Sequence, residues 1–261
     1  MKFLRIFRQI VWSNWHLFLA YRTDALASVF SSMAWAAFSV FAVLLVTAKT
    51  GAVAGWLPSE LLLMTATYGI IVGWFHILFS HSFMRFAQIV GKGELDAYLL
   101  KPTSVAALLS IQTVRFPGLV RMGSSIGLAW WIIAHYQLHT TVLSIVGFCI
   151  LGLFGIALLY GLHLLSLTIL IHVPTATNVL ELVSVMMGTA RQPVDIAKKA
   201  PFALGLVFVP VLLSVSIPTK VLITKASVMD VVTFCLVSLT ILLVAIIAWG
   251  RALRSYVGAG G

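Results

Sequence analysis

The chain of 261 residues is 61% hydrophobic and only 9% charged, and its mean hydropathy is +1.08. A soluble domain has about 45–50% apolar and about 25% charged residues, so the composition excludes an ordinary soluble protein. The formal charge of +10 comes from 17 Lys and Arg residues against 7 Asp and Glu residues. Cations that flank membrane segments account for this excess, and no basic patch outside such flanks indicates a nucleic-acid partner.

Apolar runs of about 20 residues predict an all-α, polytopic membrane protein, because the strands of a membrane barrel are about half as long. Residues 1–24 predict an amphipathic interfacial helix, since Phe3, Ile6, Phe7 and Ile10 share one helical face. The alternative is that this stretch continues the first membrane helix. Its cations alternate with apolar residues, which is not typical of a cleavable signal peptide.

Residues 25–261 predict a single transmembrane domain with six apolar segments, each near the length of about 20 residues that spans a bilayer. The segments are 25–48, 60–80, 116–134, 142–171, 177–194 and 228–249. Lys and Arg gather at both ends of the chain and in the polar loop 81–104. The excess of cations predicts that both termini and this loop are cytoplasmic.

Residues 195–225 are apolar but interrupted by prolines, among them Pro210 and Pro218. The run 202–217 either spans the membrane or forms a re-entrant hairpin, because irregular backbone at membrane depth is tolerated where protein covers it. If both 177–194 and 202–217 spanned, the cationic C-terminus would lie outside. The charges of Lys198 and Lys199 alone favour a spanning 202–217.

The residues that enzymes and ion-driven pumps need are scarce. The chain has no Walker loop, HExxH, GxSxG or paired-cysteine motif, so no nucleotide or metal site of its own is predicted. Glu60, Glu181, Asp195 and Asp230 lie near segment ends, which argues against an ion-coupled transporter. The chain is therefore predicted not to be an enzyme, and a membrane-embedded lipid enzyme would need a converging polar set that cannot be assembled.

Two GxxxG pairs, Gly69 with Gly73 and Gly123 with Gly127, are predicted to pack helices within one bundle. The loop 91–102 is the one sizeable polar loop between long apolar segments. Glycines allow a sharp turn there, and the acids and leucines that follow can share a short helix that inserts into a partner. These features favour a permease subunit driven by a separate ATPase, with a non-transport scaffold or channel-like subunit as the alternative.

Three stretches resemble the permease subunits of bacterial type-2 (ABC-2) exporters, in the branch of uncharacterised permeases. Residues 93–102 are similar to that branch's G-x-L-D-x-x-L-L-K-P loop, and residues 191–196, Pro210 and Pro218 resemble its R-Y-P-x-x-I … P … P region. Residues 251–260 resemble its R-x-L-x-x-Y-x-S-A-G tail. Gln192 replaces the usual aromatic residue, and Val257-Gly258 replaces Ser-Ser.

The resemblance implies a type V ABC exporter fold, with an N-terminal interfacial helix, six transmembrane helices and a re-entrant hairpin before the last. It favours the re-entrant alternative for 195–225. It also implies a dimer with a second permease chain, identical or homologous, surrounded by lipids in the bacterial inner membrane. Partner ABC ATPase subunits would bind ATP and Mg, and this chain would bind no cofactor.

The resemblance further implies two groups of functional residues. The ATPase-coupling residues are Gly93, Glu94, Leu95, Asp96, Leu99, Leu100, Lys101 and Pro102. The residues of the gate and re-entrant region are Arg191, Pro193, Asp195, Pro210 and Pro218. The resemblance implies export, and a lumen poor in charge would suit an amphipathic or apolar substrate, such as a drug, a lipid or a peptide.

Overall fold

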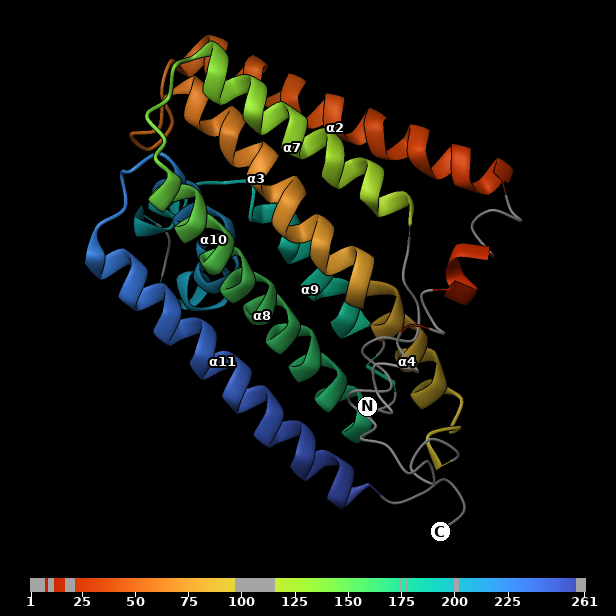
Figure 1. The fold of residues 1–261 in the computed structure, drawn as a ribbon. Helices are drawn as coiled ribbons and strands as arrows, with labels where there is room; N and C mark the ends of the chain where they lie inside the picture. Colours follow the sequence, from red (N-terminus) through yellow and green to blue (C-terminus); the bar gives the residue numbers. More distant parts are fainter. Residues whose placement is uncertain are drawn as a thin grey trace.

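The apolar segments form long helices in the computed structural model of the chain (Figure 1). The structure describes Arg8 and residues 12–16, 22–96, 116–173, 175–176, 178–199 and 202–256. The longer helices are α2 (Arg22–Thr50), α3 (Pro58–Phe75), α7 (Pro117–His135), α8 (Val142–His172), α10 (Phe202–Leu222) and α11 (Val228–Ser255). The shorter ones are the π-helix η1 (His76–Ser80), α4 (His81–Gly91), α9 (Asn178–Thr189) and the 3-10 helix η2 (Val194–Lys199). The described part of the chain is all-helical, as predicted.

Helices α8 and α11 run side by side in the same direction (Figure 1). Gly161 of α8 lies against the backbone of Leu242 in α11, and about three helical turns later His172 Nε2 lies 3.3 Å from Ser255 Oγ. Helix α3 runs the same way, and α2 and α7 run in the opposite direction. The bundle therefore has two ends, here called the Trp56 end (residues 51–57, 136–141 and 223–227) and the Gly93 end (residues 92–96, His172 and Tyr256).

Helix α3 is the centre of the bundle. Within its most apolar stretch 78% of the residues are buried, against 6% for α2 and 17% for α11, so the outer helices present their side chains to the surroundings. Phe75, Phe83 and Phe86 are fully buried against α8 and α11. In a membrane such packing stabilises mainly through van der Waals contact, because lipid tails are as apolar as the core.

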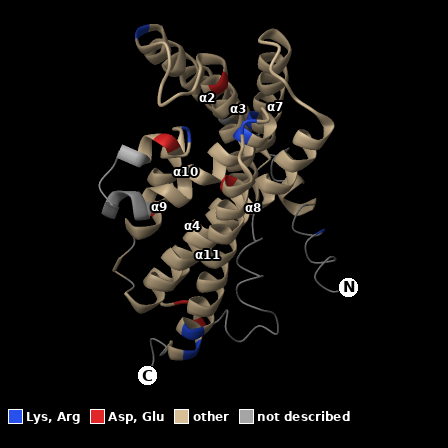
Figure 2. Cartoon of the chain, turned by 90° about the vertical axis from the view of Figure 1, so that its left-hand side faces the viewer, with Lys and Arg blue, Asp and Glu red and all other residues tan. Residues whose placement is uncertain are grey.

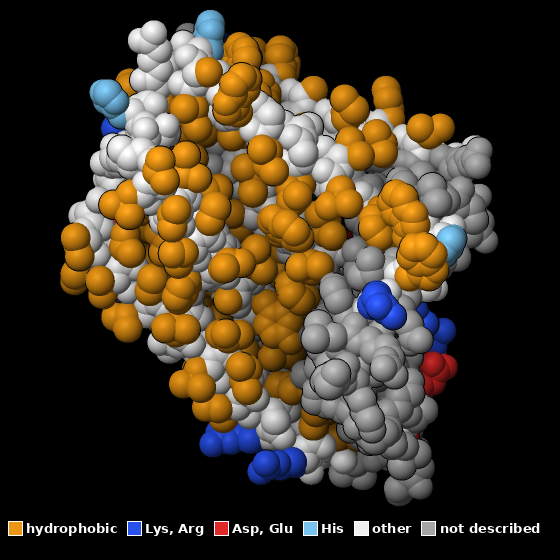
Figure 3. Space-filling model, viewed as in Figure 1, with side chains coloured by type: hydrophobic (Ala, Val, Ile, Leu, Met, Phe, Trp, Pro, Cys, Tyr) orange, Lys and Arg blue, Asp and Glu red, His pale blue; other side chains and the backbone are white. Residues whose placement is uncertain are grey.

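The surface of the bundle is apolar and its charges lie mainly toward the ends. Hydrophobic side chains cover much of the face in Figure 3, with Lys and Arg at its lower edge. Figure 2 shows few charged positions along the middle of the helices. Trp130 is 73% exposed and Val142 is 81% exposed, which a soluble protein would rarely tolerate over so large an area. This is the surface of a multi-pass membrane protein.

Four described helical stretches are long and apolar enough to cross a membrane: Val29–Thr50, Pro58–Gly91, Val142–His172 and Val228–Ser255. They correspond to predicted segments one, two, four and six. Helix α7 occupies predicted segment three, but Arg121 and several small polar residues make it less apolar. Helix α9 has 12 residues and is about 18 Å long, too short for predicted segment five to span as one helix. The predicted count of six spans is therefore not confirmed.

The second membrane helix extends well past its predicted end at residue 80. The π-helix η1 joins α3 to the 11-residue helix α4, so part of the predicted loop 81–104 is helical. Phe83, Phe86, Ile89 and Val90 of α4 are buried and follow helical spacing, which explains the extension. Of the predicted interfacial helix 1–24, the structure describes Arg8, residues 12–16 as helix, and the start of α2 from residue 22.

One of the two GxxxG pairs packs a helix as predicted. A Cβ on Gly69 would overlap the side chain of Ser125, and one on Gly73 would lie 3.7 Å from Met122 Cβ, so α3 and α7 approach closely there. The other pair, Gly123 and Gly127 of α7, has no described atom within 4 Å of an added Cβ. That pair does not pack helices within the described part of this chain.

Candidate functional site

The predicted coupling segment begins with a tight turn at the Gly93 end. The Glu94 N–H donates to Ile89 O and the Gly93 N–H donates to Val90 O, both at 3.0 Å. This is the Schellman pattern, which ends a helix with one residue in the left-handed region. Gly93 is that residue, with φ of 72°. The sequence predicted a sharp glycine turn here, and its geometry depends on Gly93 rather than on Gly91.

The residues after the turn alternate between buried and exposed. Leu95 is fully buried in the main core cluster with Phe86 and Trp249, whereas Glu94 and Asp96 are exposed. Leu95 therefore anchors the turn to α4 and α11, and the two carboxylates face outward. The other predicted coupling residues, Leu99, Leu100, Lys101 and Pro102, lie outside the described residues.

The end of α11 lies beside this turn. Burial raises the pKa of the Tyr256 phenol, and the nearby Asp96 carboxylate raises that pKa further. Both effects disfavour the phenolate. The turn is thus joined to the end of α4 by hydrogen bonds, and the Asp96 carboxylate lies near enough to the end of α11 to act on the Tyr256 phenol.

The predicted gate residue Asp195 lies at the Trp56 end, within a small polar cluster. Its Oδ2 accepts a hydrogen bond from Trp56 Nε1 at 3.0 Å and forms an ion pair with Lys220 Nζ at 3.1 Å. Lys220 also lies 5.8 Å from the centroid of the Trp56 ring. The Asp195–Lys220 pair is about 15% exposed on each side, so water screens it less than a surface pair. The cluster joins η2, α10 and the turn before α3.

A second ion pair also lies at the Trp56 end of the bundle. Lys225, just after α10, pairs with Glu60 in the first turn of α3, and the other carboxylate oxygen of Glu60 accepts from the Leu57 N–H at 3.1 Å. Glu60 is 3% exposed, so its carboxylate is buried at the helix N-terminus, where the helix dipole stabilises a negative charge. These contacts join residues 165 positions apart in the sequence.

The prolines of the gate region shape α10. Pro218 lacks an N–H and cannot donate to the carbonyl of Ser214, four residues earlier. That carbonyl lies against Gly155 of α8, where an added Cβ would be 2.7 Å from the oxygen. Ser216 Oγ accepts from the Val194 N–H at 3.0 Å, so α10 also holds the chain next to Pro193. Gly147 of α8 likewise lies against Val221 of α10, so the second half of α10 packs antiparallel beside the first half of α8.

Arg191, the remaining gate residue, lies between the two ends of the bundle. Its Nη1 donates to Ser39 Oγ at 3.0 Å, and its guanidinium lies 4.5 Å from the centroid of the Tyr68 ring and 5.9 Å from that of Trp35. Arg121 of α7 lies 5.9 Å from the same Tyr68 ring. All three distances fall within the range of cation–π attraction.

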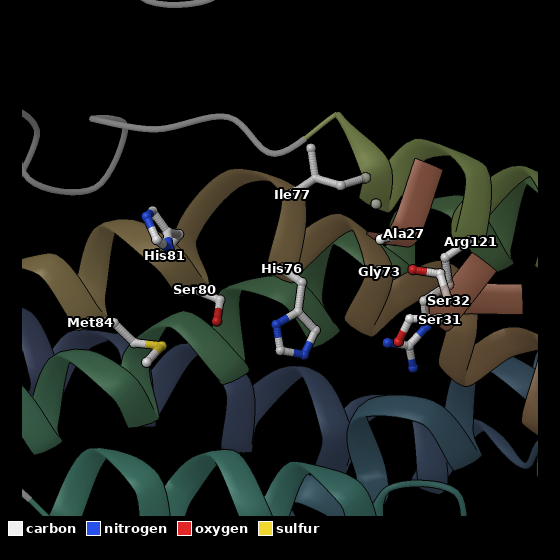
Figure 4. A pocket seen from close by; sticks show the side chains of 11 residues that line it. Ala27, Ser31, Ser32, Gly73, His76, Ile77, Ser80, His81, Met84 and Arg121 are labelled. Atoms are coloured by element: carbon white, nitrogen blue, oxygen red, sulfur yellow. The ribbon is translucent and has the colours of Figure 1, made fainter. Parts of the chain in front are cut away.

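Two cavities follow α2 and α3 on either side of Tyr68. The larger, about 470 Å³, is nearer the Gly93 end and is lined by Ala27, Ser31, Ser32, Gly73, His76, Ile77, Ser80, His81, Met84, Gly118 and Arg121. In Figure 4, Arg121 lies with Ser31 and Ser32 at one end of this cavity, and Met84 lies at the other. The smaller, about 320 Å³, is nearer the Trp56 end, has mostly apolar walls and includes Arg191 and Ser39.

A comparison with known families matches residues 33–260 to the family described as ABC-2 family transporter protein. The chain belongs to the ABC-2 transporter family. A search of curated proteins and a search of solved structures each found no match. The match confirms the resemblance drawn from the three motifs, and it covers the Gly93 turn, the gate region and the C-terminal tail.

Family membership makes this chain a membrane permease of an ABC transporter, which works with ABC ATPase subunits. Permeases of the ABC-2 family are transport components that generally lack a catalytic site. Among the described residues, no group of three or more His, Cys, Asp or Glu side chains could hold a metal ion.

The structure also brings in residues that the sequence did not single out. Trp56, Lys220 and Glu60 contact the gate region, and Tyr68 and Ser39 contact Arg191. The only signal for them was their type: a polar or aromatic residue inside or beside an apolar run. Except for Lys220, which pairs with Asp195, their partners lie more than a hundred residues away, and no local pattern reports such distances.

Proposed function

We propose that this ABC-2 permease is the transmembrane subunit of an ATP-driven exporter that moves an amphipathic or apolar substrate out of the cytoplasm. The observation that carries the proposal is the turn at the Gly93 end. Leu95 is buried and fastens the turn to the core, whereas Glu94 and Asp96 are exposed to a partner. A polar turn that is anchored in the core can pass a displacement of a bound ATPase on to the membrane helices.

In this proposal the partner ATPase subunits bind ATP and Mg, and this chain binds neither. ATPase closure displaces the segment 93–102, in which Leu99, Leu100, Lys101 and Pro102 complete the contact surface. The motion passes through Leu95 to α4 and α11, because close-packed cores transmit displacements instead of absorbing them. Two permease chains, identical or homologous, form the translocation path between them.

The proposed orientation has the Gly93 end and both termini in the cytoplasm of a bacterial cell, with the chain in the inner membrane. Arg251, Arg254 and Lys92 near the Gly93 end support it, since cytoplasmic flanks carry an excess of cations. The exposed apolar side chains of α2, α8 and α11 then face lipid or the second permease.

The segment from Arg191 to Pro218 is proposed to act as the outer gate, with η2 and α10 as a re-entrant region. The support is that Asp195 already lies at the Trp56 end before α10 begins, and that α10 ends there again. Pro210 and Pro218 inside α10 weaken the regular hydrogen bonding that would resist a hinge.

The test is the substitution Asp96→Arg in the chain co-expressed with candidate ABC ATPase subunits. A charge-assisted hydrogen bond at a partly buried contact contributes about 1.5–3 kcal/mol, so we expect about a 10-fold to 150-fold weaker ATPase association. Lys49→Glu is the matched control, because Lys49 is an exposed charge at the opposite end of the bundle.

Insertion is checked by membrane fractionation, association by co-purification and coupling by substrate-stimulated ATP hydrolysis. Unchanged co-purification and hydrolysis in the Asp96→Arg variant would refute the coupling proposal. A stable ATPase complex without any transport would instead favour the scaffold alternative.

A further inference from the structure

Arg191 is a cation within the bundle that no described carboxylate balances. Among the described residues, the ion pairs are Asp195–Lys220 and Glu60–Lys225, and neither includes Arg191. Its Nη1 bonds to the neutral Ser39 Oγ, and its buried Nε has no hydrogen-bond partner. An arginine has five N–H donors and keeps its charge in proteins. Cations at membrane depth are costly and rare, and they often mark the route of a transported ligand.

The cavity beside Arg191 is suited to an apolar tail. Phe38, Val43, Val46 and Leu61 belong to its wall, and its volume of about 320 Å³ falls within the range of about 300–1,000 Å³ typical of small-molecule sites. No described acidic side chain lines it. Its charged group is thus a single guanidinium beside an apolar chamber.

The larger cavity repeats the same electrostatic pattern. Arg121 is its cation, His76 and His81 add further nitrogen atoms, and no described acidic side chain lines it (Figure 4). It includes Ser31 of α2 and Gly73 of α3, whereas the smaller cavity includes Phe38 of α2 and Thr65 of α3, each about two helical turns nearer the Trp56 end. The two cavities therefore lie in series between the Gly93 end and the Trp56 end.

Tyr68 lies on α3 between Thr65, which lines the smaller cavity, and Gly73, which lines the larger one. Its side chain is 6% exposed, and the guanidinium groups of Arg121 and Arg191 lie 5.9 Å and 4.5 Å from its ring centroid. A headgroup that leaves Arg121 would thus meet a second guanidinium, that of Arg191, beside the same aromatic ring. The arrangement places two arginines, one lining each cavity, around one aromatic side chain.

We propose that these cavities bind an amphiphile with an anionic headgroup, which Arg121 receives first and Arg191 second, while the apolar tail occupies the chamber along α2. The direction of this passage rests on the proposed export function, but the binding chemistry does not. Arginine forms charge-assisted, often bidentate hydrogen bonds to phosphate and carboxylate. A cationic amphiphile would be repelled by both arginines, and a neutral one would leave both guanidinium groups without a counter-ion.

The experiment measures binding to the full-length chain in nanodiscs of phosphatidylcholine, by titration calorimetry with empty nanodiscs subtracted. The probes are dodecyl phosphate, dodecanol and inorganic phosphate. We expect saturable binding of dodecyl phosphate alone, because the site needs both the anion and the tail. Arg191→Gln should weaken this binding about 10-fold to 150-fold, and Arg121→Gln should weaken it as well. Arg251→Gln, at an exposed arginine near the end of α11, should leave it unchanged.

Equal binding of dodecanol, equal binding of inorganic phosphate, or dodecyl phosphate binding that Arg191→Gln leaves intact would each overturn the proposal. If Arg191→Gln does not give a monodisperse protein, Ala42→Phe decides the matter by filling the smaller cavity while every charge is kept. Binding that is undiminished in Ala42→Phe would then overturn it. These measurements need no ATPase, so their failure is distinct from a failure of the Asp96→Arg test.

Discussion

The contact between α8 and α10 allows a sharp test of how the gate region is held. An added methyl group in Gly155→Ala would lie 2.7 Å from the carbonyl oxygen of Ser214 and 3.4 Å from Ile71 Cγ2. The oxygen belongs to the backbone and cannot rotate away, so α10 would have to shift. Overpacking of this kind costs about 1–3 kcal/mol.

Gly152→Ala is the matched control in the same helix. Its added methyl group would lie 3.9 Å from Ile71 Cγ1, an ordinary van der Waals contact. Both substitutions gain about 0.8–1.0 kcal/mol of helix propensity, so this gain cancels in the comparison. We therefore expect Gly155→Ala to be less stable than Gly152→Ala by about 1–3 kcal/mol, about 5-fold to 150-fold in the unfolding equilibrium.

The assay is reversible unfolding of the purified chain in mixed maltoside and dodecyl sulfate micelles, followed by far-ultraviolet circular dichroism. Unfolding midpoints of the two variants and the parent give the difference directly. Equal stability of Gly155→Ala and Gly152→Ala, or a more stable Gly155→Ala, would refute the close approach of the Ser214 carbonyl to α8.

Three further predictions concern the two ends of the bundle. Gly93→Ala should destabilise the chain by about 1–2 kcal/mol because of its left-handed φ, whereas Gly91→Ala should not, in the same unfolding assay. A double-mutant cycle of Asp195→Asn and Lys220→Gln should give a coupling energy of about 1–3 kcal/mol, since the pair is largely buried. Because the pKa of Tyr256 is raised in the folded state, its contribution is complete below the unfolded pKa of about 10 and is lost as pH rises through the folded pKa. Tyr256→Phe should therefore lose less stability between pH 9 and pH 11 than the parent.

Each of these predictions has a contrary outcome. Equal losses in the two glycine variants would mean that the turn does not depend on its left-handed residue. Additive effects of Asp195→Asn and Lys220→Gln would mean that the ion pair contributes nothing to stability. A Tyr256→Phe variant with the same alkaline profile as the parent would contradict the perturbed phenol.

The sequence predicted what depends on local pattern. Apolar length indicated the membrane helices, and the glycines at 91 and 93 indicated a sharp turn, which the structure describes. Leu95 was expected to insert into a partner with the other leucines, but it is buried in the core of this chain. The end of the second helix was placed too early at residue 80. The reason is that α4 is amphipathic, with its apolar face buried against α8 and α11, and hydropathy alone undervalues such a helix.

Contacts between distant segments could not be predicted. Glu60 and Lys225 meet only because α3 begins where α10 ends, and Arg191 meets Tyr68 only because the α9–η2 junction lies between α2 and α3. Of two identical GxxxG patterns, Gly69 and Gly73 face a neighbouring helix, whereas Gly123 and Gly127 face no described one. The pattern permits close packing, but the topology decides which pair is used.

The central claim is that the Gly93 end of this ABC-2 permease receives the ATPase, and site-specific crosslinking tests it most directly. The probe is a photoreactive maleimide on Glu94→Cys, in a chain whose Cys149 and Cys235 are replaced by serine, in complex with its ATPase. Lys49→Cys, at the opposite end, is the control position. The account predicts an adduct with the ATPase subunit from residue 94 and none from residue 49. An intact complex with no adduct from residue 94, or with one from residue 49, would contradict it.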